Sequence, residues 1–166
     1  MANTSPEYRI VDEPPGGIGA RGYVVNPGWP LIAIALSGAV PGLLWLVYNA
    51  YAINSATRDR EFIFVIFGIL GAAVISGGVF ALADVIPSQT FPYVLLILVT
   101  WKMMAAYFVH LDQERSLELF EYYGGRVRGG FLPMIAIDIV GRIIGLSLAE
   151  TLPAVSALFY DRNFLW

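Results

Sequence analysis

Four long runs of apolar residues, separated by short polar segments, make up most of this 166-residue chain. They cover approximately residues 29–53, 62–83, 91–110 and 131–149, and each run holds about 18 to 25 residues. Because a helix rises about 1.5 Å per residue, a run of this length reaches across the hydrocarbon core of a bilayer, which is about 30 Å thick. The pattern therefore predicts an all-α polytopic membrane protein with four transmembrane helices.

The third run continues into a segment of different character, residues 111–123. Charged residues alternate there with Leu117, Phe120 and Tyr123, whose spacing places them on one face of a helix. We expect this amphipathic segment to extend the third helix, and to lie at the membrane interface or dock on a partner. The two glycines that follow are residues that commonly end helices.

The first run contains Gly38, Pro41 and Gly42 near its middle. Proline lacks a backbone donor and its ring clashes with the preceding turn, so we expect a kink at this point in one crossing helix. Gly38 and Gly42 are four residues apart, as are Gly141 and Gly145 in the fourth run. Small residues at this spacing let two helix backbones approach closely, so both pairs are candidate sites of helix packing.

The two ends of the chain differ from the apolar runs. Residues 1–28 are rich in proline and glycine and predict an extended arm, which either stays solvated or becomes ordered on a neighbouring subunit. Residues 150–166 contain an apolar stretch too short to cross a bilayer, together with aromatic residues typical of an interfacial tail. The expected organisation is therefore an arm, a membrane domain over residues 29–149, and a tail.

The composition agrees with this organisation and excludes several functions. The chain is 57% hydrophobic and only 14% charged, whereas soluble proteins carry about 25% charged residues. A net charge of −3 argues against nucleic acid as a partner, and the absence of cysteine excludes thiolate metal sites and thiol nucleophiles. The sequence contains no motif of a serine hydrolase, zinc protease or phosphate-binding loop, so we expect no enzymatic activity.

The arginines are distributed unevenly between the two sides that four crossing helices would define. The loops after the first and third helices share one side and carry five arginines, against three on the other side. Because short cytoplasmic loops are enriched in basic residues, we expect these loops in the cytoplasm and both termini outside, in a bacterial inner membrane. Arg126 and Arg128, in the second of these loops, are candidates for contact with anionic lipid headgroups.

Three ionisable side chains, Lys102, Asp138 and Arg142, fall within the apolar runs. Each costs about 2.5 to 3.5 kcal/mol at the centre of a membrane helix, so each needs a compensating partner. Asp138 and Arg142 are four residues apart on one helix face and can pair directly. Lys102 lies at a similar depth, so we expect one buried network between the third and fourth helices. Such a network either fixes which helices meet or lines an ion or proton path.

His110 is the only histidine of the chain. One imidazole is enough to ligate a haem or the magnesium of a chlorophyll-type pigment, whereas a structural zinc site needs four ligands. A single histidine at a helix end beside Asp112 is more commonly an interfacial residue. We therefore expect no cofactor, with a pigment or haem at His110 as the alternative.

Two functions from different classes are compatible with these patterns. The first is a small structural or accessory subunit of a larger respiratory, photosynthetic or secretory membrane complex, with lipid and other membrane subunits as its partners. The second is an oligomeric transporter or channel, with Lys102, Asp138 and Arg142 along its path. The first is favoured because a transporter usually shows paired broken helices or an internal repeat, and neither is evident in the sequence.

Overall fold

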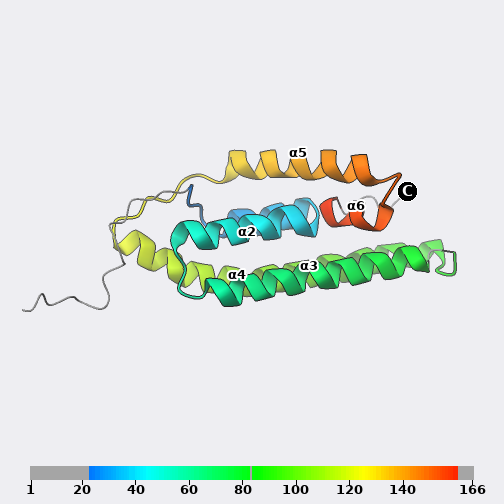
Figure 1. Cartoon of the computed structure of the whole chain (residues 1–166), viewed down its shortest axis with the longest axis horizontal. Coiled ribbons are helices and arrows are strands. Elements are labelled where there is room, and N and C mark those ends of the chain that lie inside the picture. The colour runs from blue at the N-terminus through cyan, green and yellow to red at the C-terminus, as the bar shows by residue number, and fades with distance from the viewer. Residues whose placement is uncertain (1–22, 83, 161–166) are drawn as a thin grey trace, which may run out of the picture.

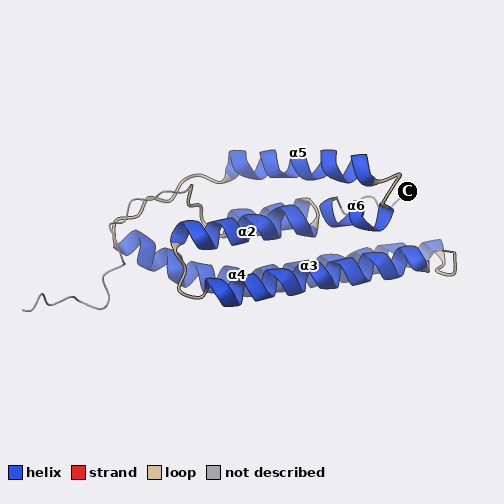
Figure 2. Cartoon of the chain, viewed as in Figure 1, coloured by secondary structure: helices blue, strands red, loops and turns tan. Residues whose placement is uncertain are grey.

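The computed structural model describes residues 23–82 and 84–160, so residues 1–22 of the expected arm and 161–166 of the expected tail lie outside it. The helices of the described residues form three layers: α5 on one side, α1, α2 and α6 in the middle, and α3 with α4 on the other side (Figures 1 and 2). The elements are α1 (Gly28–Leu36), α2 (Ala39–Ile53), α3 (Arg58–Ala81), the 3-10 turn η1 (Ser88–Thr90), α4 (Phe91–Tyr122), α5 (Phe131–Leu148) and α6 (Pro153–Phe159).

Three of these helices, α3, α4 and α5, are long and apolar enough to cross a membrane. α3 and α4 are antiparallel, since the Phe64 and Phe108 rings stack at 5.5 Å while the indole N–H of Trp101 donates to the Gly68 carbonyl at 3.2 Å. α4 is one continuous helix of 32 residues, so it includes the expected amphipathic extension of the third run. Three of the four apolar runs therefore form helices compatible with an integral membrane protein.

The first apolar run does not form a single crossing helix. Gly42 of α2 lies against Ile34 of α1, and the Asn49 side chain bonds the backbone of Val25, so α1 and α2 are antiparallel. Both ends of the run consequently lie at the same end of the bundle. The expectation of four crossing helices was wrong for this run, because the chain reverses at residue 37 where only a kink was predicted.

Backbone geometry explains the reversal. Ser37 and Gly38 are both extended, which interrupts the helical hydrogen bonds between α1 and α2. Pro41 then falls in the first turn of α2, where backbone N–H groups have no intrahelical partner and proline is tolerated. The proline therefore begins a new helix instead of bending an existing one.

A fourth path of membrane-spanning length is assembled from two segments that are distant in the sequence. The C-terminal end of α6 meets the N-terminal end of α2, where the Gly38 N–H donates to the Phe159 carbonyl at 3.0 Å. α6 and α2 lie end to end in Figure 1. Their 7 and 15 residues give a combined length of about 33 Å, enough to cross a hydrocarbon core. We call the meeting point of Ser37, Gly38 and Phe159 the junction.

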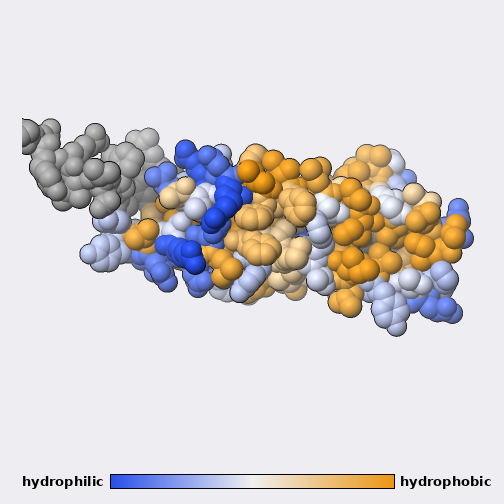
Figure 3. Space-filling view, turned by 90° about the horizontal axis from the view of Figure 1, so that it is seen from below, coloured by the Kyte–Doolittle hydropathy of each residue, from blue (hydrophilic) through white to orange (hydrophobic). Residues whose placement is uncertain are grey.

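The middle layer is covered on one side by α3 and α4. The buried core lies between the middle layer and these two helices. Large apolar residues remain exposed along α3, α4 and α5, as expected for helices that face acyl chains. In the view of Figure 3 the hydrophilic residues gather mainly at the end of the molecule where the α1–α2 hairpin opens. We call this the basic end because, interspersed with acidic residues, it carries five arginines: Arg58, Arg60, Arg115, Arg126 and Arg128. The buried residues of the main cluster are Ile34, Ala39, Leu43, Leu46, Val65, Ala72, Val79, Leu98, Ala106, Val109, Ala157 and Leu158.

The hairpin makes a testable prediction about topology, and the chain's lack of cysteine makes single-cysteine labelling straightforward. Cysteines at Asn26, Ala56 and Gly129 should react with an impermeant maleimide from one side of the membrane, because all three positions lie at the basic end. Cysteines at Val85 and Thr151 should react from the opposite side. Labelling of position 26 together with position 85 would instead indicate a first run that crosses the membrane.

Candidate functional site

Lys102 lies at the junction and is completely buried. It is 11 residues into α4, about 16 Å from the start of that helix and therefore near the middle of its apolar part. Its ammonium group donates to the Ser37 carbonyl at 2.6 Å. Ser37 caps the C-terminal end of α1, where unpaired carbonyl groups concentrate negative partial charge. The positive charge of Lys102 therefore stabilises the point at which the hairpin turns.

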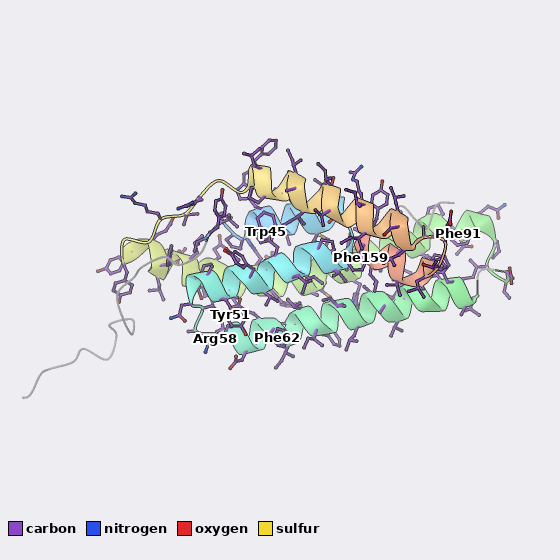
Figure 4. The ribbon with its side chains drawn as sticks, turned by 45° about the horizontal axis from the view of Figure 1, so that its top comes forward. Trp45, Tyr51, Arg58, Phe62, Phe91 and Phe159 are labelled. Carbon is purple, nitrogen blue, oxygen red and sulfur yellow. The ribbon has the colours of Figure 1, made fainter. Side chains whose placement is uncertain are left out.

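The junction has no space for a side chain at position 38. A Cβ atom at Gly38 would overlap the Leu158 carbonyl and the Phe159 backbone. Gly42 permits the equally close approach of Ile34 within the hairpin. Figure 4 labels Phe159 at the inner end of α6, beside the start of α2. Glycine at positions 38 and 42 thus allows three helical segments to converge at one depth.

The glycines of α5 contact the same short helix. A Cβ at Gly141 would lie 3.1 Å from the Phe159 carbonyl, and one at Gly145 would lie 2.7 Å from the Cβ of Tyr160. α6 therefore packs inside the bundle with Ser156 buried, whereas the sequence suggested a tail at the interface. Its small residues make this packing possible, but their partner, the glycine face of α5, is identified only by the tertiary structure.

Asp138 and Arg142 form an ion pair along α5 at 2.9 Å. The Arg142 guanidinium also lies over the Tyr160 ring, 5.2 Å from its centroid. The Arg142 side chain is 43% exposed, and the Asp138 side chain is 17% exposed. The ion pair therefore lies on a flank of α5 that the rest of the chain covers incompletely.

The structure does not join Lys102 to this ion pair. The middle layer separates α4 from α5 (Figure 1), and within residues 23–82 and 84–160 no ion pair links Lys102 to Asp138. The lysine and the α5 pair are therefore two separate polar sites. The sequence placed them at similar depth but gave no sign of the hairpin between them.

Sequence reasoning missed a third polar site, which fastens the basic end. The Asn49 amide receives a hydrogen bond from the Val25 N–H at 3.1 Å and donates to the Val25 carbonyl and to the Gln113 side chain. Gln113 in turn donates to the Leu46 carbonyl at 2.7 Å and to the Glu61 carboxylate at 2.9 Å. These bonds tie α2, α3 and α4 to the segment that precedes α1.

Glu61 is almost fully buried, yet its carboxylate is well satisfied. In addition to Gln113, it accepts hydrogen bonds from the hydroxyl groups of Ser55 and Thr57. A sequence signal for this site did exist on α4, where Lys102 and Gln113 share a helical spacing with apolar residues. The structure shows that this stripe is buried. The stripe consists of Lys102, Ala106, Val109, Gln113 and Leu117.

The remaining candidates lie at or near the basic end. His110 stacks on Tyr107 and its Nε2 lies 3.9 Å from the Glu114 carboxylate. No group of three or more metal-ligating side chains occurs in the part of the chain that the structure describes. Arg126 and Arg128 are exposed, and the Arg128 guanidinium lies over the Tyr23 ring at 5.3 Å.

Residues 23–28, the last part of the expected arm, are ordered on this chain itself. The Arg128 N–H donates to the Val24 carbonyl at 2.8 Å, and Val25 forms an isolated parallel bridge with Arg128. The Tyr23 hydroxyl donates to the Gly129 carbonyl. These bonds hold the start of the hairpin against the loop that precedes α5.

Comparisons of the chain with protein-family models, with curated proteins and with solved structures find no significant match. Function must therefore be inferred from the three polar sites and the surfaces around them. The junction and the basic-end network are internally satisfied and serve the fold, whereas the α5 ion pair is left partly uncovered.

The junction predicts that Gly38→Ala destabilises the protein by about 1 to 3 kcal/mol, because the new Cβ forces α6 and α2 apart. Gly77→Ala is the matched control, since a Cβ there has no neighbour within 4 Å. That change should stabilise α3 by about 0.5 to 1 kcal/mol. Thermal unfolding in detergent measures both effects, and equal melting temperatures for the two variants would contradict the tight junction.

Proposed function

We propose that this chain is a small structural or accessory subunit of a larger integral membrane assembly. Another polypeptide of that assembly covers the flank of α5 that carries Asp138 and Arg142. The observation that carries the proposal is the 43% exposure of the Arg142 side chain near the middle of a helix long enough to cross a membrane.

The energetic argument begins with depth. Arg142 is six residues from the C-terminal end of α5 and 11 residues from its start, so it lies about 9 Å from the nearer end. An arginine that faces acyl chains costs about 2.5 to 3.5 kcal/mol at the centre of a membrane helix, and arginines at membrane depth normally face protein or water. Coverage by a neighbouring subunit removes this cost.

The placement of α5 favours the same conclusion. Only 17% of its residues are buried inside the bundle, against 28% for the apolar windows of α3 and α4. α5 is an outer layer by itself (Figure 1), so most of its surface is available to a partner. A membrane partner with a polar group at the same depth would fit this flank.

The arginine distribution supports one orientation. The basic end carries Arg126 and Arg128 in the loop before α5, Arg58 and Arg60 at the start of α3, and Arg115 near the end of α4. Residues 84–90 and 149–152 at the opposite end contain two acidic residues and no basic one. By the positive-inside rule, the basic end is cytoplasmic, most simply in a bacterial inner membrane.

This orientation places residues 23–28 on the cytoplasmic side. The sequence alone favoured an N-terminus outside, because a crossing first run was assumed. The single-cysteine variants described above decide the orientation when intact cells and inverted vesicles are labelled in parallel.

The subunit proposal is tested by purification in mild detergent. The tagged wild-type protein should co-purify with a stoichiometric membrane partner, and the double variant Asp138→Asn/Arg142→Gln should lose that partner while remaining folded. Changing both residues avoids leaving one unpaired charge at membrane depth. Arg58→Gln, at an exposed position outside the middle of the membrane, is the control and should retain the partner. A wild-type protein that purifies alone contradicts the proposal.

The junction favours transport as the second candidate function. The ends of α1, α2 and α6 converge there beside Lys102, and broken helices that end near the midplane commonly mark transport sites. Because the junction is tightly closed, the subunit proposal predicts no solute or ion flux in proteoliposomes. A wild-type flux that Lys102→Met abolishes and Arg58→Gln leaves unchanged would favour transport instead.

A further inference from the structure

A groove of about 310 Å³ runs between α2 and α5. Its volume is at the lower end of the range of small-molecule sites. α2 forms one wall, α5 forms the other, and Phe159 of α6 also lines the groove. All eight lining residues are apolar: Val40, Pro41, Leu44, Ala136, Ile137, Val140, Ile144 and Phe159.

The groove is elongated along the membrane-spanning direction. Its α5 wall extends from Ala136 to Ile144, a rise of about 12 Å. Val140 and Arg142 are two residues apart and therefore point to opposite sides of α5. The groove is consequently separate from the charged flank that we assign to a partner subunit.

A basic group lies beyond the end of the groove nearest the basic end, linked to its α2 wall through two tyrosines. The α2 wall contains Val40 and Leu44, and Tyr48 continues the same helical face one turn further. The Tyr48 hydroxyl accepts a hydrogen bond from the Tyr23 N–H at 3.0 Å. The Tyr23 ring carries the Arg128 guanidinium on its face, at 5.3 Å. These contacts thus connect the α2 face that lines the groove to an exposed arginine.

We infer that this groove binds one acyl chain of an anionic phospholipid whose phosphate contacts Arg128. The groove opens between helices within the membrane-spanning part of the bundle, where acyl chains are the surrounding solvent, and it offers only apolar contacts. Stacking on Tyr23 occupies one face of the guanidinium and leaves its N–H edges available to a phosphate oxygen. Arg126, two residues away and also exposed, adds positive charge at the same end.

The two parts of the site have different consequences. Burial of methylene groups in the groove supplies affinity for any phospholipid of sufficient chain length. The arginine supplies the preference for an anionic headgroup over a zwitterionic one. This inference does not depend on the subunit proposal, because the groove and the α5 ion pair lie on different flanks.

Native mass spectrometry of the full chain tests the site with phosphatidylglycerol and phosphatidylcholine added in parallel. The wild-type protein should retain one phosphatidylglycerol more tightly than phosphatidylcholine. Arg128→Gln should reduce that preference by about fivefold, because one arginine near an anionic headgroup contributes about that factor. Arg58→Gln is the matched control, since Arg58 also lies over a tyrosine ring at the basic end but away from the groove. It should leave the preference unchanged.

Ala136→Phe tests the acyl-chain part by filling the groove, and should weaken binding of both lipids by more than tenfold. Ile143→Phe places the same ring on the exposed face of α5 and should have no effect.

Equal lipid binding by Ala136→Phe and Ile143→Phe would overturn the proposal, as would an Arg128→Gln protein with the wild-type preference. Loss of a protein partner from Ala136→Phe, with lipid binding retained, would show that a helix occupies the groove. Arg128→Gln remains informative if Ala136→Phe fails to fold, because Arg128 is exposed.

Discussion

The constraint on which this structure depends is that backbone polar groups inside a bilayer must find partners within the protein. Helices α3, α4 and α5 pair their backbone groups through their own helical hydrogen bonds, but the turn at Ser37 and Gly38 cannot do so. The chain satisfies that turn with the Phe159 carbonyl at the end of α6 and with the ammonium group of Lys102. An interrupted path of membrane-spanning length is thereby built from α6 and α2, and α1 lies as a half-length helix beside it.

This arrangement separates the ionisable groups into structural and exposed sites. Lys102 neutralises the carbonyl end of α1, and the Asn49–Gln113–Glu61 network fastens the mouth of the hairpin to α3 and α4. Both sites are fully enclosed, so their polar groups stabilise contacts between segments distant in the sequence. Only the α5 pair, in the part of the chain described, combines membrane depth with substantial exposure. That difference is the physical basis for assigning a partner to α5.

The two flanks of α5 also explain why one helix can serve two kinds of neighbour. Its charged flank carries a partly exposed ion pair, whereas the groove beside α2 presents only apolar side chains and suits an acyl chain. Of the arginines at the basic end, Arg128 is linked through Tyr23 and Tyr48 to the α2 wall of the groove. The subunit proposal and the lipid proposal therefore use different flanks of the same helix.

The sequence by itself determined the all-helical class, the three apolar helices, the continuous extension of α4 and the four-residue spacings of Gly38, Gly42, Gly141 and Gly145, because these follow from local periodicity and composition. The same local pattern could not distinguish a kinked crossing helix from a hairpin, since Ser37 and Gly38 permit both. Only the tertiary structure decided that the first run turns back, that α6 completes the path of α2, and that Lys102 and Asp138 lie on opposite sides of the middle layer. Each of these outcomes depends on contacts between residues far apart in the chain, whose energies appear only when the helices pack.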